Sequence, residues 1–242
     1  MTGNLLDGWR VEEYGRSRDG VALRVFLPAA DGSVTGLLIA AQHGEEAVTA
    51  LLARRLLERV SGHGTRWAIV PVANPDGLIN GTRQNAVGVD LNRNFPATTW
   101  RPVESFTYPP GIEDDRRVLA NRTNLSSPGE YAGSEPETRA LMALVERLQP
   151  PLVLDLHSPL ELVLPRGDVP AAAVEALSRA AKLPIVDDVG GPCPGAFDDW
   201  LLDVGIPGIV YEVEHAGLPA LCARHLPGLE ALVRAPNDAM PS

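Results

Sequence analysis

The chain alternates between short apolar runs and longer segments with helical periodicity. Apolar runs of strand length are bounded by Gly, Pro or polar residues and lie at 21–27, 35–41, 66–74, 152–157, 161–165 and 207–214. Apolar residues spaced three or four apart predict helices at 46–60, 134–148, 171–181, 196–205 and 226–235. Ser134 and Glu137 have the spacing of a capping box at the start of the second helix. Uninterrupted apolar strands that alternate with helices are typical of a sheet covered on both faces. We therefore predict a three-layer α/β/α sandwich with a mixed, largely parallel central sheet.

One segment, from about 95 to 133, departs from this pattern. It is rich in Pro, Thr, Arg and Asn and has little periodicity. A loop of that length is usually functional or mobile. Because the α/β pattern resumes after it, we interpret it as an excursion over one rim of the sheet, within a single domain of residues 1–242.

Composition excludes several classes of protein. Hydrophobic residues make up 45% of the chain and charged residues 21%, which is typical of globular domains. The sequence has no apolar run near the ~20 residues of a membrane helix and no secretory signal at its start, so we expect a cytoplasmic protein without a membrane partner. A net charge of −10 argues against nucleic acid as a partner. The two cysteines, Cys193 and Cys222, are too few for a disulfide framework and lack the spacing of a cysteine zinc site.

Polar residues follow several predicted strands, where open α/β sheets bind their ligands. His43 and Glu46 form a His-x-x-Glu pair at a strand-to-helix junction, and His157 ends another apolar strand. Two imidazoles and one carboxylate are a ligand set of catalytic zinc, which keeps a fourth position open for water. Each residue alone has an ordinary explanation: Glu46 could complement a helix dipole, and His157 could be a rim histidine.

Two further strings carry candidate chemistry. The string GTRQNAVGVDLNRNFP at 81–96 is the most specific in the chain, and its Arg residues suit capture of a carboxylate, although a polar loop would also explain it. In GIVYEVEH at 208–215, Glu212 and Glu214 are expected on one face of a strand, because side chains alternate. Either could be the base that activates a water, or both could be a solvated pair.

Together the motifs resemble the zinc carboxypeptidase family, over about residues 35 to 235. They occur in a fixed order, namely His-x-x-Glu, Asn-Pro-Asp-Gly, GVDLNRNFP, SEPET, a strand ending in His and a strand carrying Glu. The short chain is most similar to the bacterial murein peptide amidase branch. That resemblance implies hydrolysis of a C-terminal peptide bond or of the γ-D-glutamyl-meso-diaminopimelate amide in cell-wall peptides. The implied partner is a peptide with a free carboxylate.

The resemblance also implies roles for single residues. His43, Glu46 and His157 match the ligands of one zinc ion per chain. Glu212, preferred to Glu214, matches the general acid and base, and Arg83 the residue that stabilises the developing oxyanion. The remaining matches are Asn92 and Arg93 for the terminal carboxylate of the substrate, Asp90 as the partner of His43, and Asp198 at the base of the specificity pocket.

Two positions bear on how the side chain of the substrate is bound and covered. An acid at Asp198 would suit a substrate side chain with an amine, such as Lys, Arg or diaminopimelate, but it could also cap a helix. The mobile Tyr that is frequent in the family is absent from the loop VGGPCPG, so Tyr108 and Tyr131 become candidates for capping the substrate. Cys193 in this loop is expected to be a bystander.

Two other functions share these features. A zinc-dependent deacylase of N-acyl amino acids, of the aspartoacylase type, has the same His-x-x-Glu and a distant His. A relative that binds cell-wall peptides without cleaving them would be favoured by the missing Tyr and disfavoured by an intact Glu212. The sequence predicts no oligomeric state.

Overall fold

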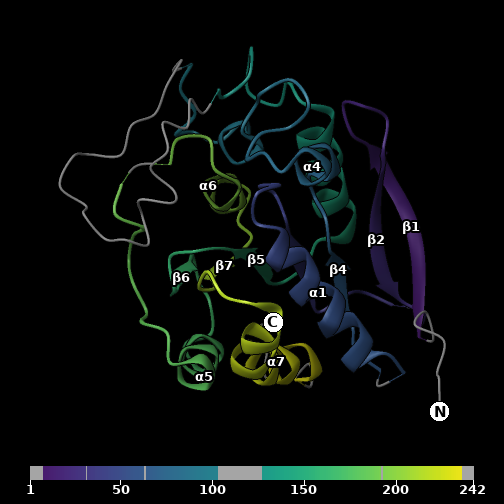
Figure 1. The fold of residues 1–242 in the computed structure, drawn as a ribbon, viewed down its shortest axis with the longest axis vertical. Coiled ribbons are helices and arrows are strands. Elements are labelled where there is room, and N and C mark those ends of the chain that lie inside the picture. The colour runs from purple at the N-terminus through teal and green to yellow at the C-terminus, as the bar shows by residue number, and fades with distance from the viewer. Residues whose placement is uncertain (1–7, 31, 63, 103–126, 192, 236–242) are drawn as a thin grey trace.

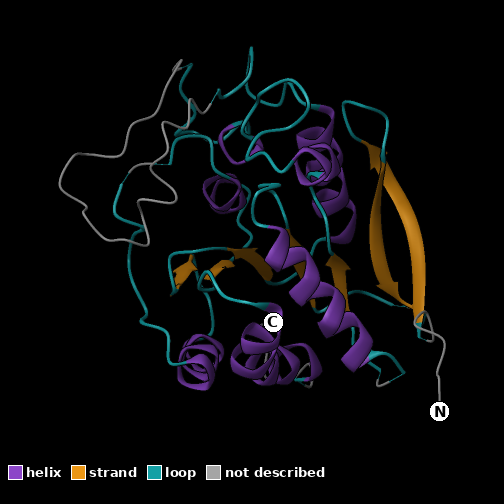
Figure 2. Cartoon of the chain, in the orientation of Figure 1, coloured by secondary structure: helices purple, strands orange, loops and turns teal. Residues whose placement is uncertain are grey.

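Seven strands form one mixed sheet between two layers of helices in the computed structural model of this chain (Figures 1 and 2). The structure describes residues 8–30, 32–62, 64–102, 127–191 and 193–235. The strands are β1 (Trp9–Arg16), β2 (Ala22–Pro28), β3 (Gly36–Ala40), β4 (Trp67–Val70), β5 (Val153–His157), β6 (Leu162–Arg166) and β7 (Gly208–Glu212). The helices are α1 (Ala47–Val60), α2 (Pro75–Asn80), the 3-10 turn η1 (Leu91–Arg93), α4 (Pro136–Leu148), α5 (Ala171–Ala181), α6 (Phe197–Asp203) and α7 (Leu218–Arg234).

The strand order is β1-β2-β4-β3-β5-β7-β6. The central strands β4, β3, β5 and β7 are parallel, whereas β1, β2 and β6 join antiparallel. The predicted three-layer architecture is confirmed, with parallel pairing confined to the centre of the sheet. The short segment between β5 and β6 explains the antiparallel edge, because a parallel connection needs a crossover of a dozen or more residues.

The helices cover the two faces of the sheet separately. In Figure 1, α1, α5 and α7 lie on one side of the strands, and α4 and α6 lie on the other. Alternate residues of β3 divide between the two cores: Leu38 and Ala40 belong to the first, Leu37 and Ile39 to the second. Burial on both faces explains why the central strands are apolar along their whole length.

Several predicted boundaries were wrong. The run 66–74 forms a strand only to Val70, because Asn74 caps the short helix α2 by accepting a hydrogen bond from the Gly77 amide. Helix α7 starts at Leu218, well before the predicted residue 226, and contains Pro227. Strand β1 was not predicted.

The capping box was also wrong. Helix α4 begins at Pro136, and the Ser134 hydroxyl donates to the Glu135 carboxylate instead of capping the helix. Glu137 accepts a hydrogen bond from the backbone amide of Arg18, at 2.8 Å, because the β1–β2 turn lies against this helix start.

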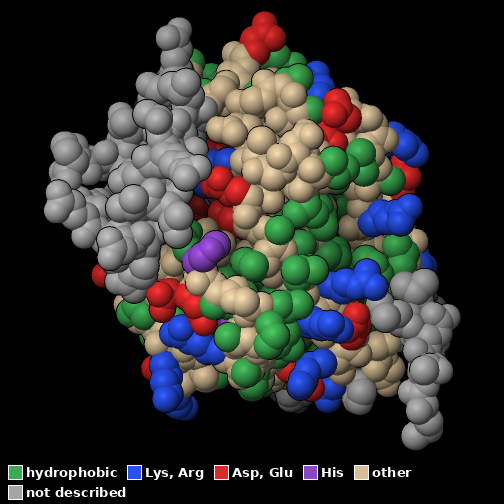
Figure 3. Space-filling model, in the orientation of Figure 1, with side chains coloured by type: hydrophobic (Ala, Val, Ile, Leu, Met, Phe, Trp, Pro, Cys, Tyr) green, Lys and Arg blue, Asp and Glu red, His purple; other side chains and the backbone are tan. Residues whose placement is uncertain are grey.

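Within the described part of the chain, none of the helices is long and apolar enough to cross a bilayer. Figure 3 shows basic and acidic side chains interspersed over one face of the molecule, without a broad basic area on that face.

Candidate active site

Three buried side chains meet at the carboxyl edge of the parallel strands. His43 follows β3, Glu46 precedes α1, and His157 is the last residue of β5. Their ligand atoms all lie within 4.8 Å of one another. Glu46 lies between the imidazoles, with Oε1 2.6 Å from His43 Nδ1 and Oε2 3.1 Å from His157 Nδ1. Both rings therefore present Nδ1 to the same point.

A close contact between two turns positions His43. A Cβ atom on Gly44 would lie 1.9 Å from the carbonyl carbon of Gly77, so only glycine fits there. The Asn74 side chain, fully buried, donates to the carbonyl oxygens of Gln42 at 3.1 Å and Arg83 at 3.3 Å. The Asn-Pro-Asp-Gly motif thus joins the turn of His43 to the segment of Arg83.

Each imidazole has a carboxylate on its other side. His43 Nε2 lies 3.3 Å from Asp90 Oδ1, and His157 Nε2 lies 3.0 Å from Asp155 Oδ2. Asp155 also accepts a hydrogen bond from Gln42 Nε2 at 2.9 Å. Asp90 was singled out from the sequence, but Asp155 was missed. The signal was present, since Asp155 lies two residues before His157 and shares its face of β5.

The charges of the cluster are tightly coupled. Burial would raise the pKa of Glu46, but His43 and His157 hold it well below its usual range. Burial would lower the pKa of His157, but Asp155 and Glu46 raise it well above its usual range. Burial also opposes ionisation of Asp90, but Arg83 and His43 keep its pKa well below the usual value.

Glu212 lies beside this cluster, whereas Glu214 does not. Glu212 ends β7 in register with His157, and its Oε2 accepts a hydrogen bond from the Leu160 amide at 3.2 Å. Burial, with a smaller contribution from Glu46, raises the pKa of Glu212 to about 7 against the opposing effect of His157. A carboxyl with a pKa near neutrality suits general acid and base chemistry.

The expectation that Glu212 and Glu214 share one strand face was wrong. Strand β7 ends at Glu212, and the chain then turns toward α7. There the Glu214 carboxylate lies 2.6 Å from His225 Nε2 and 3.2 Å from Arg224 Nη1.

Arg83 lies near the ligand cluster. Its Nε donates to Asp90 Oδ2 at 2.8 Å, and its Nη1 lies 3.9 Å from Glu46 Oε1. Asp90 in turn accepts a hydrogen bond from the backbone amide of Asn92 at 3.0 Å. One buried carboxylate therefore links His43, Arg83 and the Asn92 turn.

Asn92 and Arg93 lie against the start of α6. Asn92 Oδ1 accepts a hydrogen bond from the Phe197 amide at 2.8 Å, which leaves its Nδ2 group as the donor for a ligand. Arg93 Nη2 lies 3.4 Å from Cys193 Sγ. Gly195 has φ +73°, and a Cβ there would come within 2.5 Å of the Arg93 carbonyl oxygen, so glycine permits this approach.

Asp198 does not cap α6, because Ala196 occupies the cap position. Its Oδ2 lies 2.8 Å from Arg166 Nε at the end of β6. Burial raises the pKa of Asp198, with Arg166 opposing that effect. No sequence pattern indicated this partner, which precedes Asp198 by 32 positions and lies on a different element.

Asn94 is a second residue that the sequence analysis missed. Its buried amide group donates to the carbonyl oxygens of Pro128 and Tyr131 and to the Ser134 hydroxyl, at 2.7, 3.1 and 3.0 Å. It therefore fastens the end of the long excursion beside η1. Tyr131 is 56% exposed, and Tyr108 lies outside the described residues.

Comparison with known proteins agrees with this geometry. A family model described as zinc carboxypeptidase matches residues 10–182. Murein peptide amidase A of Escherichia coli K12 is 35% identical over 231 residues, which cover 95% of this chain and 92% of that protein. The protein of the same name from Vibrio campbellii is 31% identical over 227 residues, covering 93% and 88%.

Comparison with solved structures points to the same family as the sequence comparisons. The crystal structure of a murein-tripeptide amidase from E. coli O157 matches with a TM-score of 0.81 and 33% identity, over 93% of this chain and 92% of that one. Thrombin-activatable fibrinolysis inhibitor matches with a TM-score of 0.73 over 96% of this chain and 69% of that one, but at 18% identity it shows the shared fold alone. This chain is therefore a hydrolase that belongs to the zinc carboxypeptidase family.

Proposed function

We propose that this hydrolase is a zinc-dependent amidase of murein peptides. It would cleave the amide between a γ-D-glutamyl residue and a C-terminal meso-diaminopimelate. The observation that carries the proposal is the buried His43–Glu46–His157 cluster with Glu212 beside it. The murein amidases among its relatives support the substrate class.

The donor set fits zinc. Three ligand atoms within 4.8 Å of one another can approach one ion at the usual distances of about 2.0–2.2 Å after small adjustments. Both imidazoles direct Nδ1 inward and place Nε2 beside a carboxylate, the arrangement that fixes the tautomer of a metal-binding histidine. A zinc ion there would act as a Lewis acid toward the substrate carbonyl and would acidify water.

The other residues of the site would transfer protons, stabilise charge and bind the substrate. Glu212 would take a proton from the attacking water and later deliver it to the leaving amine. The Arg83 guanidinium, held by Asp90, would stabilise charge on the carbonyl oxygen. Asn92 Nδ2 and Arg93 would hold the terminal carboxylate of the substrate, so that the scissile amide lies one residue further in.

The test combines metal analysis with hydrolysis. Purified protein is incubated with L-alanyl-γ-D-glutamyl-meso-diaminopimelate, with peptides ending in Phe or Arg, and with N-acetylated amino acids. We expect about one zinc per chain and chelator-sensitive release of diaminopimelate. Release from the N-acetylated amino acids alone would favour the deacylase, and a metal-loaded protein that binds the tripeptide without cleaving it would overturn the proposal.

A pair of neighbouring glutamates supplies the control. Glu46→Gln should lose zinc, because it removes a charged ligand. Glu45→Gln should keep it, because Glu45 is 39% exposed at its side chain and lies outside the cluster. The cytoplasmic location and the single-domain organisation stay predictions of the sequence.

A further inference from the structure

An ion-paired group of three side chains lies at the far end of β6. Asp198 Oδ2 is 2.8 Å from Arg166 Nε, and Asp199 Oδ1 accepts a hydrogen bond from Arg166 Nη2. Asp199 is itself fixed by the Thr99 hydroxyl, which donates to Oδ2 at 2.7 Å. The side chain of Arg166 remains 25% exposed, and its Nη1 has no hydrogen-bond partner among the described residues. Arg166 is thus ion-paired with two carboxylates while its side chain stays partly exposed.

Apolar residues connect this group to Glu212. In the β6–β7 register, Leu162 lies opposite Glu212, Leu164 opposite Val210 and Arg166 opposite Gly208. Side chains two apart share a face, so Leu162, Leu164 and Arg166 point to the same side of the sheet. Leu162, Leu164 and Val210 form a separate apolar cluster. Arg166 therefore lies four residues, roughly 13 Å along the strand, from the level of Glu212.

The same group is tied to the residues proposed to hold the terminal carboxylate. Asp198 directly follows Phe197, whose amide donates to Asn92 Oδ1. The Cys193 thiol, in the loop that leads to α6, lies 3.4 Å from Arg93 Nη2. A C-terminal residue anchored by Asn92 and Arg93 would therefore have Asp198 and the apolar cluster close to its side chain.

We propose that Arg166 and Asp198 together recognise a substrate side chain that ends in a carbon bearing both an ammonium and a carboxylate group. The proposal rests on the proposed amidase function and names the residues that recognise the side chain of the leaving residue. The carboxylate binds the accessible edge of Arg166, and the ammonium binds Asp198. The leucines accommodate the methylene groups between the anchored and the distal ends.

Charge alternation distinguishes this ligand from a simple amine. With the ligand bound, the charges of neighbouring groups alternate in sign. The order is Asp199, Arg166, the ligand carboxylate, the ligand ammonium and Asp198. A lysine side chain would leave the Arg166 edge unpaired and place its ammonium near a guanidinium. A site built to pair with a polar group of its substrate disfavours an analogue that lacks that group. An unpaired acid at Asp198, as expected from the sequence, would instead have suited any side chain with an amine, whether Lys, Arg or diaminopimelate.

The test uses three tripeptides that differ only at the distal carbon. Their C-terminal residues are meso-diaminopimelate with both groups, lysine with the ammonium only, and 2-aminopimelate with the carboxylate only. We expect kcat/KM of the native enzyme to fall roughly 10- to 100-fold when either group is removed, the factor for one hydrogen bond to a charged group. This series needs no variant, so a folding defect cannot obscure it.

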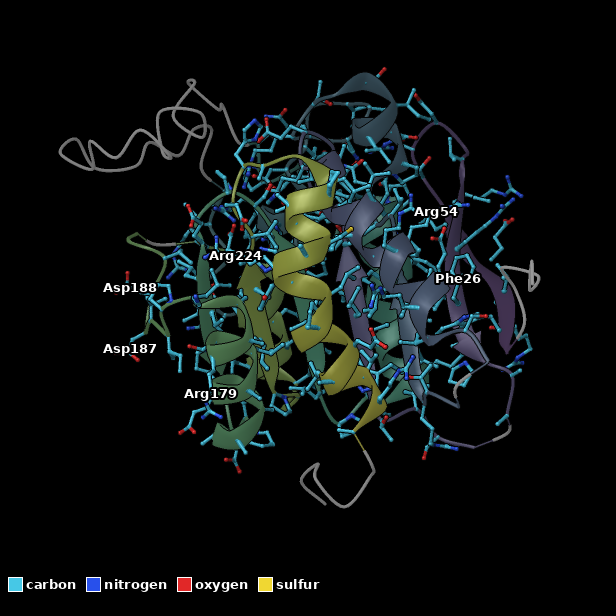
Figure 4. The ribbon with its side chains drawn as sticks, turned by 60° about the horizontal axis from the view of Figure 1, so that its bottom comes forward. Phe26, Arg54, Arg179, Asp187, Asp188 and Arg224 are labelled. Carbon is cyan, nitrogen blue, oxygen red and sulfur yellow. The ribbon has the colours of Figure 1, made fainter. Side chains whose placement is uncertain are left out.

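Substitutions at two positions then assign the groups. Arg166→Gln should lower kcat/KM for the diaminopimelate peptide by a similar factor and leave the lysine peptide nearly unchanged, and Arg166→Lys should lie between. Asp198→Asn should spare the 2-aminopimelate peptide and impair the other two. Arg179→Gln is the matched control, because Arg179 lies on α5 with its side chain 78% exposed (Figure 4).

The outcomes separate the two proposals. Equal hydrolysis of the diaminopimelate and lysine peptides by the native enzyme would overturn the role of Arg166 while leaving the amidase function intact. An Arg166→Gln enzyme that loses both activities by the same factor would do so too. Failure of the native, zinc-loaded enzyme on all three peptides would overturn the amidase function and this inference with it.

Discussion

The Nε2 atom of His157 lies 3.0 Å from the Oδ2 atom of Asp155, two residues earlier on the same strand. Residues so spaced on a strand share a face, so the backbone itself holds the carboxylate beside the imidazole. Gln42 fixes the same oxygen from the neighbouring strand end, at 2.9 Å. The pair keeps Nδ1 of His157 directed at Glu46.

Asp155→Asn should therefore weaken zinc binding. A partner of this kind is worth about 10- to 100-fold in metal affinity, because it fixes the ring and its tautomer. Competition with a chromogenic chelator measures the zinc dissociation constant. Asp187→Asn removes the same charge at an exposed position (Figure 4) and should leave that constant unchanged. Equal affinities in the native and Asp155→Asn proteins would contradict the orienting role.

Glu212 and Glu214 provide a matched pair of substitutions for the catalytic base. Glu212→Gln should lower kcat by about 10²- to 10⁴-fold while zinc content and substrate binding persist, because the proton acceptor is lost. Glu214→Gln should keep activity close to that of the native enzyme, since Glu214 binds His225 and Arg224 instead. Steady-state kinetics and metal analysis of both variants test this assignment. The opposite ranking would transfer the role to Glu214.

The raised pKa of Glu212 predicts a pH dependence of stability in the metal-free protein. In the folded protein the pKa of the Glu212 carboxyl is about 7, whereas its ordinary value is 4.5. Between these values the native state binds more protons than the unfolded state, so the free energy of unfolding falls as pH rises. The contribution is on the order of 3 kcal/mol.

The difference between native and Glu212→Gln proteins reports on this carboxyl and on the groups coupled to it, because the rest of the chain is identical. Urea unfolding of both, without metal, from pH 4 to 8 should show the native protein losing stability relative to the variant across that window. A constant difference would mean that Glu212 titrates normally.

Gly44→Ala should destabilise the protein and its metal site together. The new Cβ would lie 1.9 Å from the Gly77 carbonyl carbon, and backbone cannot yield as a flexible side chain does. We expect a loss of about 3 kcal/mol in unfolding free energy, at the upper end for overpacking. Gly217→Ala is the control, since its nearest neighbour would be 3.9 Å away and its φ is not positive. Denaturant unfolding compares the two, and equal stabilities would show that the turns separate easily.

The sequence by itself determined the architecture and the main candidates of the site. Apolar runs and helical periodicity are local properties, so they predicted the three layers and most of the elements. Motif order predicted that His43, Glu46, His157 and Glu212 belong together. The structure places these residues along one edge because the carboxyl ends of β3, β5 and β7 meet there.

Only the tertiary structure decided which of several similar residues face that edge and what they contact. Glu212 and Glu214 both lie in the predicted strand, and the end of β7 at Glu212 separates them. In the sequence, Asp198 has no evident ion-pair partner. In the folded chain, Arg166 lies beside it. In the sequence, Asn94 looks like an ordinary loop residue. In the folded chain its side-chain amide donates hydrogen bonds to Pro128, Tyr131 and Ser134. Such partners lie 32 to 40 positions apart in the sequence, so no local spacing constrains them. Hydrogen bonding of buried polar groups in the folded chain does constrain them.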